Sequence, residues 1–191
     1  MRQKIFMVQM LVASVALALS ACASVESPKN QSQPEIDRSP SHNLTTPPWG
    51  QTVSKEQIAP VYLNEWKKAE NRRSCALLAL PKDSAAQVSG AGVRRAQFSG
   101  GWAVAYDTPG LKSAYGVAGT GTSVGNTTEY AWPKQKAWAD GSRMGYGLEG
   151  GVGPAYLAYV RVAGQSCLYN VWSRVSEEHL LQIVSDLRRV Q

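Results

Sequence analysis

Residues 93–106, which read VRRAQFSGGWAVAY, decide the fold class of this chain. Two runs within them, 93–98 and 102–106, alternate polar with apolar residues or are rich in the aromatic and branched residues that favour strands. Gly100 and Gly101 lie between the runs, and glycine readily adopts the positive φ angles that tight hairpin turns require. The segment therefore predicts two antiparallel strands joined by a short turn.

Residues 75–80 are a short apolar run that ends before Pro81, and further segments alternate or are rich in aromatic and branched residues, with short connections between most of them. These further segments cover residues 113–118, 143–148, 156–162 and 167–174. Short connections favour antiparallel pairing of successive strands. We therefore expect one antiparallel meander of six or seven strands.

Apolar residues recur at helical spacing on both sides of this strand-rich region. Residues 55–72 follow a capping box of Ser54 and Gln57, although Pro60 allows the helix to begin only there. Residues 176–189 begin with a serine and two glutamates, which suit a helix N-terminus, and carry a second apolar stripe. Two such helices must bury their apolar sides against the sheet, so the sequence predicts an α+β fold.

The N-terminal region has the layout of an export signal. Arg2 and Lys4 precede an apolar run over residues 5–19, which is shorter than the roughly 20 residues that a membrane-spanning helix needs. The tetrapeptide Leu19-Ser20-Ala21-Cys22 at its end resembles the lipobox of bacterial lipoprotein precursors. The resemblance implies that the preceding peptide is removed and that Cys22 receives acyl chains, palmitate among them, that hold the protein on a membrane.

The residues after Cys22 indicate which of the two bacterial membranes, inner or outer, would hold the lipid anchor. Ala23 and Ser24 stand where, in such lipoproteins, an aspartate favours retention at the inner membrane. The resemblance therefore implies a lipid anchor in the outer membrane and a domain in the periplasm. The alternative is an ordinary secretory signal cut near Ala21 or Ala23, with Cys22 an incidental thiol.

Composition divides the chain into three regions. Residues 1–21 form the predicted signal peptide, and residues 22–52, rich in Pro, Ser, Asn and Gln, form a predicted disordered tether. Residues 53–191 are the length of one ordinary domain.

Without Arg2 and Lys4 the formal charge falls from +6 to +4, and the remaining arginine pairs are scattered. We interpret them as solvated surface and expect no nucleic-acid partner.

Two cysteines remain after the lipid site. Cys75 and Cys167 can pair in only one way, and an exported protein meets an oxidising compartment, so we expect a disulfide between the first and last strands. The alternative is two buried free thiols.

With only two histidines in the chain, no set of cysteine and histidine has the spacing of a structural zinc site, and we expect neither metal nor cofactor.

A glycine-rich region, residues 107–154, carries a cluster of aromatic residues. We predict ligand or partner contacts for four of them, namely Tyr130, Trp132, Trp138 and Tyr146. Residues 130–138 lack strand periodicity and contain a proline, so we expect a loop whose exposed rings stack on sugar or peptide. The alternative is that both tryptophans fold back onto the sheet as a lid.

The sequence offers little for catalysis. His179 lies in the first turn of the last helix, and neither Ser173 nor Ser176 has the surroundings of a nucleophile elbow. We therefore expect no catalytic residue, and predict a non-enzymatic lipoprotein that binds another envelope component, either a protein or the cell wall. The alternative is a cell-wall hydrolase that uses a carboxylate pair drawn from Asp107, Asp140 and Glu149.

Overall fold

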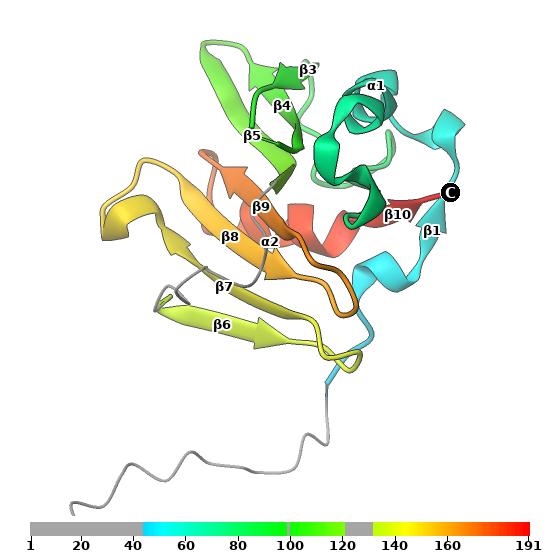
Figure 1. Cartoon of the computed structure of the whole chain (residues 1–191). Coiled ribbons are helices and arrows are strands. Elements are labelled where there is room, and N and C mark those ends of the chain that lie inside the picture. Colours follow the sequence, from blue (N-terminus) through cyan, green and yellow to red (C-terminus); the bar gives the residue numbers. More distant parts are fainter. Residues whose placement is uncertain (1–43, 99, 121–131) are drawn as a thin grey trace, which may run out of the picture. The chain divides into compact units, whose positions relative to one another are not determined.

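A seven-stranded antiparallel sheet with two α-helices packed against it forms the body of the protein (Figure 1). The computed structural model describes residues 44–98, 100–120 and 132–191. Along the sheet the strands follow in the order β3 (Gly92–Ala96), β4 (Trp102–Thr108), β5 (Leu111–Thr120), β9 (Leu168–Ser173), β8 (Tyr156–Arg161), β7 (Arg143–Leu148) and β6 (Lys134–Ala137). The helices are α1 (Pro60–Lys68) and α2 (Glu177–Asp186). The predicted α+β class, with seven strands and a helix from each end of the domain, is confirmed.

The strand order differs from the single meander that the sequence predicts. Strands β3 to β5 form one meander and β6 to β9 another, and the two join where β5 pairs with β9. In that central pairing Val117 lies opposite Val171. A contact between residues so far apart in the chain leaves no local signal, which is why short connections alone gave the wrong order.

Both helices lie on the same face of the sheet, which we call the helix-covered face. Tyr62 of α1 packs against Tyr106, with ring centroids 6.5 Å apart, and His179 of α2 packs edge-on against Tyr115 at 4.8 Å. Tyr106 and Tyr115 lie opposite each other on neighbouring strands and stack at 4.5 Å. Because paired residues point to the same side of a sheet, one face carries both helix contacts.

Alternate residues of each strand point to the other side, which we call the open face. At its centre Ala105, Gly116 and Trp172 are paired across β4, β5 and β9, and Asn170 of β9 is paired with Tyr159 of β8. Small residues dominate the β4 and β5 part of this face. Larger rings come from β8 and β9.

Three short strands form a second, smaller sheet. β1 (Thr52–Val53) pairs in parallel with β10 (Arg188–Val190), and β10 pairs antiparallel with β2 (Leu78–Ala79). Short 3₁₀ turns complete the described elements: η1 (Pro48–Gly50), η2 (Lys55–Gln57), η3 (Glu70–Arg73) and η4 (Glu149–Gly151).

The predicted helices are both shortened by these neighbouring elements. The first begins at Pro60, as its proline allowed, because the preceding capping box closes the separate turn η2, where the Ser54 N–H donates to Gln57 Oε1 at 3.0 Å. The second keeps Ser176 as its N-cap, with the His179 N–H donating to Ser176 Oγ at 3.1 Å. It ends before Arg188, which enters β10 instead.

The predicted tether extends too far toward the domain. Of its residues, 44–52 belong to the described part of the chain, and they pack against the domain rather than hanging free. Trp49 is 6% exposed and meets the Trp138 ring edge-on at 4.8 Å. Burial of Trp49 and backbone hydrogen bonds from Ala139 to the Thr45 carbonyl and from Arg189 to the Gln51 carbonyl hold this segment on the domain.

The cysteine pairing is confirmed: Cys75 and Cys167 form a disulfide with their Cα atoms 5.4 Å apart. The bridge leads from the segment before β2 to the residue before β9, so it connects the two segments that we expected as the first and last strands, although β2 belongs to the small sheet and β10 follows β9 in the chain. It joins the small sheet's chain segment to the central strand of the large sheet.

Within the described residues no helix is long and apolar enough to cross a membrane.

Candidate binding face

The structure does not bring the four predicted contact residues together. Tyr130 lies outside the described residues, and Trp138 is only 2% exposed, so its assignment to a ligand contact is wrong. Its ring is covered because Trp49, far away in the sequence, packs against it. The predicted loop that carries both tryptophans also proves to contain an edge strand, β6.

Tyr146 and Trp132 lie on opposite faces of the sheet. Tyr146 is paired with Lys134, whose Nζ reaches Glu177 of α2 at 2.5 Å, so Tyr146 belongs to the helix-covered face. Trp132 is half-buried against Gly145 and Gly147, the residues on either side of Tyr146. Since neighbouring residues of a strand point to opposite sides, Trp132 lies on the open face.

Two pairs of aromatic rings lie on the open face. Trp132 packs against Tyr159 with centroids 5.3 Å apart, and Phe98 stacks on Trp172 at 6.1 Å with an interplanar angle of 22°. Phe98 is 36% exposed, and the other three rings are half-buried. Each ring pair therefore presents part of its surface to solvent.

Glycine makes room for both tryptophans. A Cβ at Gly116 would overlap the indole of Trp172, and a Cβ at Gly145 would overlap that of Trp132. The glycines allow each ring to lie close to the sheet instead of standing out from it.

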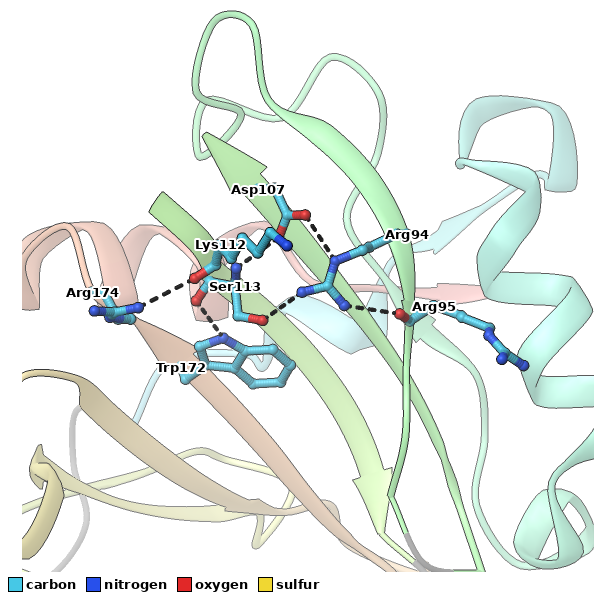
Figure 2. Close-up of polar contacts among 7 residues, drawn as sticks. All are labelled: Arg94, Arg95, Asp107, Lys112, Ser113, Trp172 and Arg174. Carbon is cyan, nitrogen blue, oxygen red and sulfur yellow. Dashed lines mark hydrogen bonds and ion pairs between the residues drawn. The ribbon is translucent and has the colours of Figure 1, made fainter. Parts of the chain in front are cut away.

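A polar network at the β4–β5 hairpin holds Trp172 in place (Figure 2). The Trp172 Nε1–H donates to the Ser113 carbonyl at 3.2 Å, and the Ser113 N–H donates to Asp107 Oδ1 at 2.6 Å. Arg94 bridges the same two residues, donating from Nε to Asp107 Oδ2 at 2.8 Å and from Nη2 to Ser113 Oγ at 2.7 Å. Every polar group of Ser113 is thus engaged, and its carbonyl is aimed at the indole.

Ser113 adopts an unusual backbone conformation in this network. Its φ is +49°, the only positive value among the non-glycine residues that the structure describes. Such a conformation costs about 1–3 kcal/mol for most residues and persists only where surrounding contacts fix it. The Arg94 guanidinium and the Ser113 N–H also hold the pKa of the Asp107 carboxyl below its usual value, so the network is charged at neutral pH.

Asn170 adds a polar group to the open face. It is 8% exposed and lies beside Tyr159 on the neighbouring strand. Its Oδ1 is buried and accepts no hydrogen bond within the described part of the chain. A buried acceptor without a partner costs about 1–3 kcal/mol, which a donor on a bound molecule would recover.

Arginines flank the aromatic rings at both ends of the strands. Arg94 and Arg174 lie at the end that carries the hairpin network, and Arg174 donates to the Lys112 carbonyl at 3.2 Å. Arg143 lies opposite Arg161 at the other end, on the same face as Tyr159 and Gly145. The open face therefore combines apolar rings with positive charge.

The three carboxylates of the hydrolase alternative are too far apart to act as a pair. Asp140 precedes β7 and Glu149 follows it, so a six-residue strand of roughly 20 Å separates them. Asp107 ends up about four strand spacings, or roughly 19 Å, from Glu149. Paired glycosidase carboxylates lie about 5–10 Å apart. The lowered pKa of Asp107 also opposes a role as general acid.

A serine–histidine contact does occur, but it is buried. Ser173 Oγ lies 2.9 Å from His179 Nδ1, and His179 Nε2 lies 2.9 Å from the Ala86 carbonyl. That carbonyl requires a hydrogen on Nε2, which leaves Nδ1 to accept from the serine hydroxyl. Ser173 has no exposed surface. The contact attaches α2 to the sheet and to residue 86, and it offers no nucleophile to a substrate.

Sequence reasoning missed Phe98, Tyr159, Trp172 and Asn170. All four lie in or beside segments that were correctly predicted as strands, but the face of each was not assigned. Their common location depends on the β5–β9 pairing, which the local pattern does not contain.

Within the described ranges no group of three or more His, Cys, Asp or Glu residues is arranged to hold a metal ion.

Comparison of the chain with protein-family models, with curated proteins and with solved structures gives no match. The fold and the open face are therefore described from the structure of this chain alone.

Proposed function

We propose that this protein is an outer-membrane lipoprotein whose domain binds cell-wall glycan through the open face. The observation that carries the proposal is the pair of aromatic contacts, Trp132 with Tyr159 and Phe98 with Trp172, each seated on glycine and partly exposed. Aromatic rings held against a sheet offer flat apolar surfaces at small entropic cost. Such surfaces suit the apolar faces of sugar rings.

The polar groups of the same face support a cell-wall ligand. Cell-wall glycan carries hydroxyl groups and, on its peptide stems, carboxylates. The unpartnered Asn170 Oδ1 matches a hydroxyl donor, and the exposed Arg174 and Arg143, at the two ends of the strands, match carboxylates. The resemblance of Leu19-Ser20-Ala21-Cys22 to a lipobox supports the location, because an acylated Cys22 would hold the domain next to the cell wall.

Sedimentation with purified, insoluble cell-wall sacculi tests the proposal. The full lipidated chain in detergent is expected to sediment with sacculi, and the double variant Trp132→Ala with Trp172→Ala is expected to bind roughly tenfold more weakly or worse. The expectation follows from two ring contacts worth about 0.5–1.5 kcal/mol each.

Tyr146→Ala is the matched control, because it removes a half-buried aromatic ring from the opposite face of the same strand region. It is expected to leave binding unchanged. If the wild-type protein does not sediment with sacculi, or if Tyr146→Ala weakens binding as much as the double variant does, the proposal fails.

A further inference from the structure

We propose that a hollow lined by Arg72, Arg73 and Arg189 is a binding site for a phosphate group. The proposal goes beyond the glycan-binding function and uses none of its residues. It also revises our interpretation of the arginine pairs as scattered, solvated charge, because the fold brings members of two pairs to one place.

The hollow has a volume of about 520 Å³. Two chain segments line it, residues 72–76 and 164–166, and Arg189 of β10 adds to the lining from a third segment. Its lining includes two serines and a glutamine but no carboxylate. All three arginines are exposed, so their guanidinium groups are accessible to a ligand.

The two lining segments are joined firmly. The Cys75–Cys167 disulfide connects them, and the Ala76 N–H donates to Gln165 Oε1 at 2.9 Å. The Tyr169 hydroxyl contacts Gln165 and also donates to the Ala76 carbonyl at 2.8 Å. A site with fixed walls loses less conformational entropy when it binds a ligand.

The positive charge of the hollow is uncompensated in the part of the chain that the structure describes. The described ion pairs are Lys68 with Glu65, Arg94 with Asp107 and Lys134 with Glu177, none of which involves the hollow. Arg72 Nη1 donates to the Ala69 carbonyl, which orients it without neutralising it. Three like charges around one hollow repel one another, and an anion between them would remove that cost.

Phosphate is the anion that this donor set fits. The guanidinium fork of arginine matches phosphate geometry with two parallel hydrogen bonds, and several arginines can share the three or four oxygens of one group. The hydroxyls of Ser74 and Ser166 in the lining supply further donors. The phosphate can belong to a membrane lipid headgroup or to a soluble phosphoryl compound.

Binding to the full chain in neutral detergent tests the site. Inorganic phosphate and dihexanoylphosphatidylglycerol, a short-chain lipid, are titrated separately while phosphorus NMR follows each ligand. We expect at least one of the two to bind, and Arg73→Gln with Arg189→Gln to weaken that binding about tenfold or more. Stronger binding of the lipid would assign the site to headgroups, and stronger binding of inorganic phosphate would assign it to soluble compounds.

Lys67→Gln with Arg95→Gln is the matched control, since it removes the same charge from exposed positions outside the hollow. It is expected to retain binding. Equal loss in both double variants would show a general charge effect and overturn the proposal, as would the absence of binding by either ligand. Thermal unfolding of all variants checks that each is folded, and sacculus binding should be unaffected in the hollow variant, which separates this site from the open face.

Discussion

The two faces of the large sheet are built in opposite ways. On the helix-covered face large side chains such as Trp102, Tyr115 and Tyr169 fill the space beneath α1 and α2 and are at most 1% exposed. On the open face the centre of the sheet carries alanine and glycine, and the sheet's own aromatic rings lie over them. Beneath α1 and α2 these rings are almost completely buried, whereas the open face keeps its rings partly accessible. We expect the first to govern stability and the second to govern binding.

Removal of the disulfide should give the largest loss of stability. Cys75 Sγ lies near Gly119 and Trp102 on the helix-covered face, and the bond closes a loop over a sequence separation of 92 residues. Chain entropy predicts a loss of about 4–5 kcal/mol in unfolding free energy for Cys75→Ala with Cys167→Ala, as an upper figure. Urea denaturation measures it. A loss below about 1 kcal/mol in unfolding free energy would mean that side-chain packing, and not the disulfide, stabilises the helix-covered face.

Truncation of a helix residue should give the next largest effect. Leu180 of α2 has no exposed surface, so Leu180→Ala is expected to cost about 2–5 kcal/mol in unfolding free energy. The matched change on the open face, Leu157→Ala, removes a half-buried side chain and should cost less than half as much. Equal losses in urea denaturation would contradict the assignment of stability to the helix-covered face.

A methyl group added beneath an open-face ring should have a moderate effect. Gly116→Ala places a Cβ where the Trp172 indole lies, so we expect a loss of about 1–3 kcal/mol together with weaker sacculus binding. Gly92→Ala is the control, because a Cβ there meets no atom within 4 Å. If Gly116→Ala lowers stability but leaves binding intact, the position of Trp172 is not important for recognition.

The sequence predicts the two faces unequally well. The helices of the helix-covered face follow from apolar spacing and capping signals, both of which are local. Strand β6 was missed because its residues, Lys134–Ala137, are polar and follow a proline, as suits a short edge strand. The order of the strands depends on pairs such as Val117 with Val171, which only the folded chain brings together.

The candidate site shows the same limit. Trp132 lies half-buried on the open face, but Trp138 is covered by Trp49, and Tyr146 points to the other side of its strand. The alternation within β7 would have separated Tyr146 from Trp132 only if Trp132 had already been placed over Gly145. Which aromatic residues share a face is therefore a property of register, which local sequence does not determine.

The smallest effect concerns pH and the Asp107 network. The pKa of Asp107 is lower in the folded protein because Arg94 and the Ser113 N–H stabilise its charged form. A lowered folded pKa gives stability that is present above the unfolded pKa, about 4, and is lost as pH falls through the folded pKa. The wild-type protein should therefore be more stable than Asp107→Asn at neutral pH, and the difference should shrink as the pH falls below about 4.

Chemical denaturation of both proteins between neutral and acidic pH measures that difference, with Asp83→Asn, an exposed change outside the network, as the control. A difference that stays constant with pH would show that the charge of Asp107 does not stabilise the hairpin. The same carboxylate fixes the Ser113 carbonyl that orients Trp172, so Asp107→Asn should also weaken sacculus binding at neutral pH. If Asp107→Asn removes the pH dependence but leaves sacculus binding unchanged, the charge network does not act on recognition through the position of Trp172.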